Sequence, residues 1–241
     1  MVDIHSHILP NLDDGAENVE ESIMLLKIMQ AQGITDVFVT PHFYPTLDNY
    51  EDFNSALLKS LKLIKKHTTN LGLPNIYLGC EMFYFVGIGD CDTLTDFTFE
   101  NSRFLLLELD PTLINEHLFD DIKKLINIQK ITPVLAHLER YADCKGYRKL
   151  LRFIKKEKIL TQINSSSLLY RESYQAVKKL IKKDLVTFMA TDTHSVDKRP
   201  PHFKTALYII EKDFGKDVKE KLIENSNSLL KKIQTETTDN A

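Results

Sequence analysis

The sequence lacks three features, each of which would have assigned it to a class of protein. No stretch approaches the roughly 18 uninterrupted apolar residues of a transmembrane helix. No basic segment followed by an apolar one marks a signal peptide at the N-terminus. Lys and Arg form no extended block, and the net charge is −3. We therefore expect no membrane span, no secretion signal and no broad nucleic-acid surface.

Cysteine is also scarce. The three cysteines (Cys80, Cys91 and Cys144) are an odd number at unrelated spacings, which is typical of free thiols in a reducing cytoplasm and not of a disulfide framework or a zinc ribbon. A cysteine-dependent phosphatase needs an arginine after five intervening residues. Arg148 follows Cys144 by only four positions, and neither other cysteine has an arginine at that spacing, so this mechanism is excluded.

The 241 residues, 43% hydrophobic and 27% charged, suit one globular domain of barrel size. Strand-like and helix-like segments alternate along it, which predicts seven β-α units and a last helix. We expect a domain at 1–233 and a disordered polar tail at 234–241. Predicted strands cover 2–5, 36–40, 76–80, 104–107, 133–136, 160–164 and 186–191; predicted helices cover 17–32, 50–70, 115–129, 146–157, 174–183, 204–214 and 217–233.

Histidines and carboxylates stand at or just beyond the ends of six of these strands. In α/β folds the carboxyl ends of the strands are where sites are built. Imidazoles and carboxylates without a thiolate are ligands for borderline divalent metals such as Zn, Mn or Fe. The sequence therefore predicts a multinuclear metal enzyme. The residues concerned are His5, His7, His42, Glu81, Glu108, His137, Asp192 and His194.

The spacing of these residues also favours a closed barrel over an open sheet. His5 and His7 are two apart on one strand, so both point to the same face and can chelate one ion. The other residues follow strands two to five and seven. All of them can meet at one site only if the first and last strands are neighbours.

Several longer motifs carry a family resemblance. The His-Ser-His opening, Pro41-His42, Glu81, "AHLERY" ending at Tyr141 and "TDTH…RPP" at 191–201 resemble the PHP (polymerase and histidinol phosphatase) family. Within it, "DIHSHILPNLDDGA", "QINSSSL" and "DxHxxxxRPPH" are similar to the manganese-dependent tyrosine-protein phosphatases of bacterial capsule and exopolysaccharide operons, the CpsB/CapC type. The resemblance runs from Val2 to about Asn225.

The resemblance implies a distorted TIM-like (β/α)7 barrel, the PHP fold, holding three divalent ions. Manganese is the first expectation, and iron or zinc also suit the ligands. Asp14 is assigned by the resemblance alone, because an Asp-Asp-Gly turn is otherwise structural. Matched position by position, the first ion would bind His5, His7, Glu81 and Asp192; the second Glu81 as a bridge, Glu108 and His137; the third Asp14, His42 and His194.

The implied activity is hydrolysis of protein phosphotyrosine, and the implied partner is the tail of a bacterial tyrosine autokinase that controls polysaccharide export. Three ions carry +6 and the four ligand carboxylates −4, so the pocket attracts a phosphate dianion. A water shared by the ions is a hydroxide near neutral pH and can attack phosphorus. Arg140 and Arg199 match the family's phosphate-binding arginines. A phenol leaves with a pKa of about 10 and needs little help from a general acid; His202 is our candidate.

Alternatives remain at several residues. Asp13 either supports a ligand or forms a turn, and Arg140 either binds phosphate or pairs with Glu139 at the surface. Four aromatic residues either flank the substrate ring or pack the loops together: Phe43, Tyr44, Phe83 and Tyr84.

Other functions also remain open. The same fold serves phosphatases of histidinol phosphate and nuclease-type phosphoesterases, and a metal-stabilised regulatory module would need no catalysis. The segment Asp90-Cys91-Asp92 resembles the nucleophile motif of haloacid-dehalogenase phosphatases, but it does not follow the opening strand as that motif requires.

Overall fold

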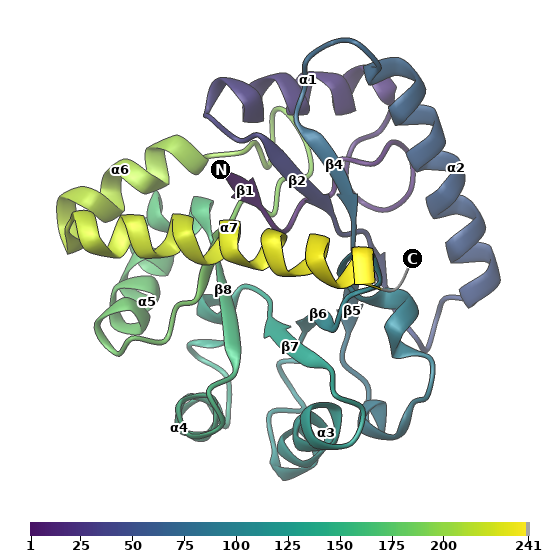
Figure 1. Cartoon of the computed structure of the whole chain (residues 1–241). Helices are drawn as coiled ribbons and strands as arrows, with labels where there is room; N and C mark the ends of the chain where they lie inside the picture. Colours follow the sequence, from purple (N-terminus) through teal and green to yellow (C-terminus); the bar gives the residue numbers. More distant parts are fainter. Residues whose placement is uncertain (240–241) are drawn as a thin grey trace.

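The computed structural model describes residues 1–239, and its strands are short and parallel throughout. The strands are β1 (Val2–Asp3), β2 (Asp36–Val39), β3 (His42–Phe43), β4 (Asn75–Leu78), β5 (Glu81–Phe83), β6 (Phe104–Glu108), β7 (Thr132–Leu135), β8 (Leu160–Asn164) and β9 (Phe188–Ala190). The helices are α1 (Val19–Ala31), α2 (Tyr50–Thr68), α3 (Glu116–Asn127), α4 (Tyr147–Glu157), α5 (Arg171–Lys182), α6 (Phe203–Phe214) and α7 (Lys216–Asp239). Helices α1 to α6 surround the strands in chain order (Figure 1).

The nine strands occupy seven barrel positions, because β3 continues β2 and β5 continues β4. Pro41, which has no N–H, interrupts the ladder between β2 and β3. The hydrogen bonding nevertheless passes through the break, since Gly79 N donates to Val39 O (2.9 Å) and Glu81 N to Pro41 O (3.0 Å). The seven predicted strands are thus all present.

The barrel closes between its first and last strands, as predicted. Asp192 N donates to His5 O (2.9 Å), His7 N donates to Thr193 O (2.8 Å), and Ser6 pairs with Thr193 in a parallel bridge. Below these bonds, the buried Asp3 carboxylate accepts from both the backbone N–H (2.9 Å) and the hydroxyl (2.5 Å) of Thr191. The two ends of the barrel are therefore hydrogen-bonded to each other beside the predicted ligands.

The third β-α unit has no α-helix, in agreement with the absence of a predicted helix between 80 and 104, so only six of the seven expected units are complete. Between β5 and β6 the described chain forms three short 3₁₀ helices, η1 (Ile88–Asp90), η2 (Leu94–Phe97) and η3 (Phe99–Asn101), and no α-helix. This segment carries no helical apolar repeat, and Gly87 adopts a left-handed φ of 92°. One side of the barrel is therefore covered by irregular chain, which accounts for part of its distortion.

Alternate residues of the strands face two separate apolar cores. The outer core lies between the strands and helices and includes Leu105 and Leu107 of β6. The inner core fills the barrel and is closed by α7, which crosses the end where the strands begin (Figure 1). It consists of Val2, Ile4, Phe38, Phe99, Phe104, Leu106, Val134, Ala136, Phe188, Ala190, Leu229, Leu230 and Ile233.

Two predicted helix limits were wrong by more than two residues. Helix α5 begins at Arg171, ahead of the expected Tyr174, and α7 continues past Ile233 to Asp239. Residues 234–239 are therefore helical, against the expectation of a disordered tail at 234–241; residues 240–241 lie outside the described part of the chain. Along residues 1–239, no helix combines the length and the apolarity that crossing a bilayer requires.

The position of α7 predicts a stability effect far from the mouth. Leu229 is 2% exposed in the inner core, so Leu229→Ala leaves a cavity that lowers the free energy of unfolding by about 2–5 kcal/mol. Asn227→Ala, at an exposed position of the same helix, is the matched control and changes this free energy by less than about 0.5 kcal/mol. Urea denaturation measures both. Equal midpoints for the two variants contradict the role of α7 as a barrel plug.

Candidate metal centre

The predicted ligands gather at the end of the barrel opposite α7, because strand alternation points them inward. In β6, Phe104, Leu106 and Glu108 face inward, and the last of these lies at the mouth. In the last barrel position, Phe188 and Ala190 face inward, and Asp192 follows them two residues on. The inward-facing side chains are thus apolar inside the barrel and charged at its mouth.

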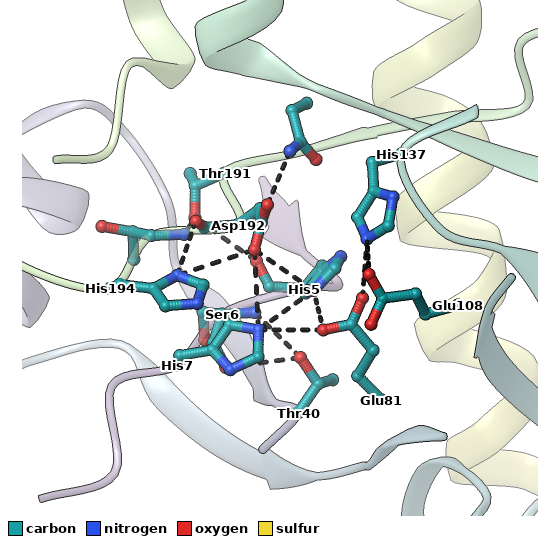
Figure 2. A network of polar contacts seen from close by, with 12 residues as sticks. His5, Ser6, His7, Thr40, Glu81, Glu108, His137, Thr191, Asp192 and His194 are labelled. Carbon is teal, nitrogen blue, oxygen red and sulfur yellow. Dashed lines mark hydrogen bonds and ion pairs between the residues drawn. The ribbon is translucent and has the colours of Figure 1, made fainter. Parts of the chain in front are cut away.

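A first cluster unites His5, His7, Glu81 and Asp192, the set predicted for the first ion. Glu81 Oε2 lies 3.1 Å from His5 Nε2 and 3.2 Å from His7 Nε2. Asp192 Oδ1 lies 3.4 and 3.5 Å from the same two nitrogens. The four side chains are buried, and Figure 2 shows them pointing toward one another. One ligand atom of each lies within 4.8 Å of all the others, a spacing that fits one ion.

A second cluster shares Glu81 with the first. Glu81 Oε1 lies 2.9 Å from His137 Nε2, which is 3.4 Å from Glu108 Oε1. On the other side, His42 Nδ1 lies 3.1 Å from Glu81 Oε2 and 3.8 Å from Glu108 Oε2. The two oxygens of Glu81 therefore face two different groups, as a bridging carboxylate requires.

A third cluster lies nearest to solvent. Asp14 Oδ1 is 3.2 Å from His194 Nε2 and 3.6 Å from His42 Nε2. The structure also places His7 in this group, which the sequence did not predict, and sets His42 between the second and third clusters. The Asp14 side chain is 64% exposed, in contrast to the buried ligands of the first cluster.

The residues of the mouth fit divalent ions for two reasons. Of the five buried side-chain atoms that have no hydrogen-bond partner within residues 1–239, three face the clusters: Glu81 Oε2, His42 Nδ1 and His194 Nε2. In addition, His5 Nε2 and His7 Nε2 face each other at 3.1 Å. Nitrogen and oxygen atoms that converge in this way on one point are the arrangement that a cation stabilises.

The opposite nitrogen of three histidines is bound to an oxygen. Nδ1 of His5 donates to Gln162 Oε1 (3.3 Å), Nδ1 of His7 to Asp13 Oδ2 (2.7 Å) and Nδ1 of His194 to the Asp192 carbonyl (3.0 Å). Each bond places a proton on Nδ1, so that Nε2 is the nitrogen that faces the clusters and is available to an ion once it carries no proton.

Asp13 therefore supports a ligand, and it also accepts from the backbone N–H groups of His42 (3.2 Å) and Gly15 (3.0 Å). Its carboxylate holds the turn and the ligand together, so both sequence alternatives apply.

Sequence reasoning missed the inward residues of β8. Gln162 Oε1 also accepts from His137 N (2.7 Å), and Gln162 Nε2 donates to Asn164 Oδ1 (2.8 Å). Asn164 Nδ2 then donates to Asp192 Oδ2 (2.6 Å). The alternation in "QINSSSL" was the available signal, since amides two residues apart in a buried strand need polar partners.

Backbone strain occurs at two of the ligands. His137 has φ 33° and Asp192 has φ 50°, in the left-handed region that residues with a Cβ adopt at a cost. Such outliers persist where surrounding bonds fix them, and they concentrate at functional sites.

Opposite charges shift the pKa values of the centre in different directions. Burial disfavours an imidazolium, yet the hydrogen bonds and charges of Asp13 and Glu81 raise the pKa of His7 to about 10. Burial and the charge of Glu81 raise the pKa of Glu108 to about 7. Burial by itself would raise the pKa of the Asp192 carboxyl. The charges of His5 and Arg140 outweigh this effect and hold the pKa far below its usual range.

Both predicted arginines lie at the mouth and bind the same oxygen. Arg140 Nη2 and Arg199 Nη2 (2.8 Å) donate to Asp192 Oδ2, whose other oxygen faces the first cluster. The two side chains are 42% and 38% exposed. The alternative pairing of Arg140 with Glu139 at the surface was wrong, because Glu139 is buried and accepts from Asn164 N and Ser167 Oγ.

The remaining predicted residues have different surroundings. His202 lines a cavity of about 100 Å³ together with Asp192 and Arg199, and burial lowers its pKa. Tyr44 and Phe83 are half-buried with ring centroids 5.4 Å apart, and Tyr44 stacks on His42.

Phe43 and Tyr84 are core residues. Phe43 packs on Phe53 and Phe97, and Tyr84 donates to Asp121 (2.9 Å). Asp90 is exposed, lies in the 3₁₀ helix η1 and pairs with Lys124, so the haloacid-dehalogenase interpretation, which requires this residue at the tip of a buried strand, has no support. Cys80, Cys91 and Cys144 are free.

Comparison with solved structures defines the class of protein. A chain from the crystal structures of YwqE from Bacillus subtilis and CpsB from Streptococcus pneumoniae, described as metal-dependent tyrosine phosphatases, matches with a TM-score of 0.85 and 27% identity, over 96% of this chain and 94% of that one. Histidinol phosphate phosphatase from Lactococcus lactis, solved with zinc, L-histidinol and phosphate, shares the fold at a TM-score of 0.56 and 14% identity, over 88% and 94%. The chain has the distorted TIM-like barrel of the PHP-fold phosphatases.

Sequence comparison then gives the family. The chain belongs to the CpsB/CapC family of capsular polysaccharide synthesis, whose model matches residues 1–231. The tyrosine-protein phosphatase CpsB of Streptococcus agalactiae serotype III is 31% identical over 96% of this chain and 98% of its own length. The tyrosine-protein phosphatase YwqE of Bacillus subtilis is 28% identical over 96% and 92%.

The pKa values predict that metal binding releases protons. With pKa values of about 10 and about 7, His7 is charged and Glu108 partly protonated at pH 7, and both must lose protons to bind an ion. We expect manganese binding to release more than one proton at pH 7 and to weaken as the pH falls. Calorimetric titration in buffers of different ionisation enthalpy measures the number.

Asp13→Asn is the informative variant, because it removes the carboxylate that raises the pKa of His7. It should release fewer protons than the wild type. Equal proton release by both proteins contradicts this account of His7.

Proposed function

We propose that the protein is a metal-dependent phosphomonoesterase that hydrolyses phosphotyrosine on proteins. The observation that carries the proposal is the convergence of His5, His7, Glu81 and Asp192 on one point of the barrel mouth, beneath two arginines. Membership of the CpsB/CapC family, and the names of relatives that match nearly the whole chain, support tyrosine phosphate as the substrate.

We further propose that the mouth holds three divalent ions, with manganese as the first choice. Three overlapping groups of potential ligands support this number, and Glu81 belongs to two of them. The second ion would bind Glu81, Glu108 and His137, with His42 beside them; the third would bind Asp14, His42 and His194, with His7 within reach. Imidazole and carboxylate ligands also accept iron and zinc.

The charge of the mouth suits a phosphate dianion. Divalent ions held there would supply a nucleophilic hydroxide near neutral pH and would neutralise phosphate oxygens. Three such ions would exceed the charge of the four ligand carboxylates, so the loaded mouth would attract anions although the chain carries a net charge of −3.

Arg140 and Arg199 are placed to bind the phosphate oxygens. A guanidinium has five N–H donors, and each of these arginines uses one nitrogen on Asp192 Oδ2. The remaining donors lie at the exposed mouth, where they can bind equatorial oxygens and stabilise charge in the transition state. The shared bond to Asp192 fixes the two guanidinium groups relative to the ligands.

We expect the leaving group of the bound substrate to contact Tyr44, Phe83 and His202. The ring of Tyr44 stacks on His42 and lies 5.4 Å from the ring of Phe83, so the two rings can flank the phenyl ring of phosphotyrosine. Since burial lowers the pKa of His202, its imidazole is neutral near neutral pH and can donate a hydrogen bond to the leaving oxygen. A phenolate leaves readily, so such limited assistance suffices.

The substrate that we propose is the tyrosine-rich tail of a bacterial tyrosine autokinase that controls capsule or exopolysaccharide synthesis. A disordered tail can extend into an exposed mouth and present a single side chain to the ions. We place the encounter in the cytoplasm, in keeping with three free cysteines.

Substitution of the side chains proposed to bind the ions provides the direct test of catalysis. His137→Ala and Asp192→Ala each take away a buried ligand candidate, so manganese-stimulated hydrolysis of a phosphotyrosine peptide should fall at least about 100-fold in each. His67→Ala, at an exposed position of α2, is the control and should retain activity.

Three results decide between the proposed function and its rivals. Faster turnover of histidinol phosphate or of a dinucleotide than of the peptide would assign the protein to another phosphoesterase of the same fold. Absence of manganese-stimulated hydrolysis of any aryl phosphate by metal-loaded protein would favour the non-catalytic regulatory module. Preferential turnover of the peptide supports the proposal.

Arg199, one of the two arginines at the mouth, allows a separate prediction. Arg199→Lys keeps the charge but loses the planar fork, so we expect the KM for a phosphotyrosine peptide to rise about tenfold, or about 1.4 kcal/mol, with a smaller change in kcat. The inhibition constant of inorganic phosphate should rise in parallel. Arg152→Lys, exposed on α4, is the matched control. An unchanged KM combined with a lower kcat would show that Arg199 acts only through Asp192.

A further inference from the structure

A cationic groove lies beside the mouth and takes no part in the chemistry described above. Its volume is about 960 Å³. One end is formed by Thr112 and Ile114, from the loop after β6, and by residues 142–146, which follow the 3₁₀ helix η4 (Leu138–Tyr141) that carries Arg140. The other end reaches Lys179 and Lys183 of α5 and its C-terminus. The groove therefore begins at the same rim as the metal centre.

The charge of the groove is opposite to that of the whole chain. Five cations line it against two carboxylates, whereas the chain as a whole carries −3. Lys149 pairs with Glu116 at 3.3 Å. The other four cations form no ion pair within residues 1–239 and are exposed: Lys145, Arg148, Lys179 and Lys183. Because these cations are unpaired and stand on both walls, the groove has a positive electrostatic potential that no salt bridge of the fold requires.

Two loops that line the groove approach each other closely at Gly146 and Ile114. Gly146 is the N-cap of α4 and has φ 93°, and a Cβ there would lie 2.3 Å from the carbonyl oxygen of Ile114. Only glycine lets the two loops meet at this point. In addition, no side chain caps the first turn of α4, so that its positive end adds to the charge of Lys145 and Arg148.

We infer that this groove docks an acidic or multiply phosphorylated segment of the same polypeptide whose phosphotyrosine occupies the metal centre. The inference rests on the proposed function and extends it to substrate recognition. Lys145 follows Arg140 by five residues, at most about 17 Å along extended chain. An extended peptide with a phosphotyrosine at the centre can therefore reach the groove with a negative charge a few residues away.

The shape of the groove favours a peptide over the other polyanions. Its cations stand on two walls around a concavity, which encloses an extended chain, whereas a membrane surface requires a flat or convex face. The seven charged residues that line it also carry a net charge of only +3, small for the long backbone of a nucleic acid.

The experiment compares three phosphotyrosine peptides at low and high salt: a neutral peptide and two others with an acidic cluster on one or the other side. For the wild type we expect kcat/KM to be about threefold to tenfold higher for one acidic peptide than for the neutral one at low salt, and this advantage should shrink as salt rises. Lys145→Glu/Arg148→Glu and, on the other wall, Lys179→Glu/Lys183→Glu should abolish the advantage while leaving turnover of the neutral peptide unchanged.

Lys59→Glu/Lys62→Glu on the exposed face of α2 changes the net charge equally and should keep the advantage. An advantage that is absent in the wild type, or that survives in both groove variants, overturns the inference while peptide turnover still supports the phosphatase.

If no peptide is hydrolysed, the proposed function fails. Fluorescence anisotropy of a labelled acidic peptide then tests the groove by itself: binding lost in the groove variants supports docking, and binding unaffected by them overturns it. Binding of vesicles containing phosphatidylglycerol through the groove, without binding of the peptide, would assign the surface to a membrane and also overturns the inference.

Discussion

The metal centre depends on the hydrogen bonds that join the first strand to the last. Asp3 and Thr191 hold the two strands together below the mouth, and the bonds of His5 O and Thr193 O continue the contact upward. His5 and His7 thereby come within 3.5 Å of Asp192 although more than 180 residues separate them in the chain. An open sheet of the same strands would place these residues at opposite edges. Barrel closure is therefore the structural requirement for the function.

Closure brings the ligands together, and hydrogen bonds around them determine which atoms face the centre. The Nδ1 atoms of His5, His7 and His194 are bound to a glutamine, a carboxylate and a carbonyl, so that their Nε2 atoms face the centre. Asp192 has one oxygen toward the histidines and the other toward Arg140, Arg199 and Asn164. This side chain links the cation-binding and phosphate-binding parts of the mouth, and the strain at its φ of 50° shows how strongly the surroundings fix it.

The two ends of the barrel have separate tasks. The end where the strands begin is apolar, sealed by α7 and concerned with stability. The end where the strands finish carries buried charges that only cations or mutual pairing stabilise, and its loops form the groove beside the arginines. The separation lets loops change recognition without disturbing the core, which fits the range of proteins that share this fold.

The sequence by itself determined the strand order, the helix positions and which residue types stand at the strand ends, because alternation and helical periodicity are local properties. It also determined that the barrel is closed, because ligand residues that follow both the first and the last strand can meet at one site only if these two strands are neighbours. Only the tertiary structure decided that His42 lies between two clusters, that His7 reaches the third, that Gln162 and Asn164 support the ligands and that Glu139 is buried. It likewise decided that α7 runs to Asp239. These features depend on contacts between residues far apart in the chain, which no local pattern records.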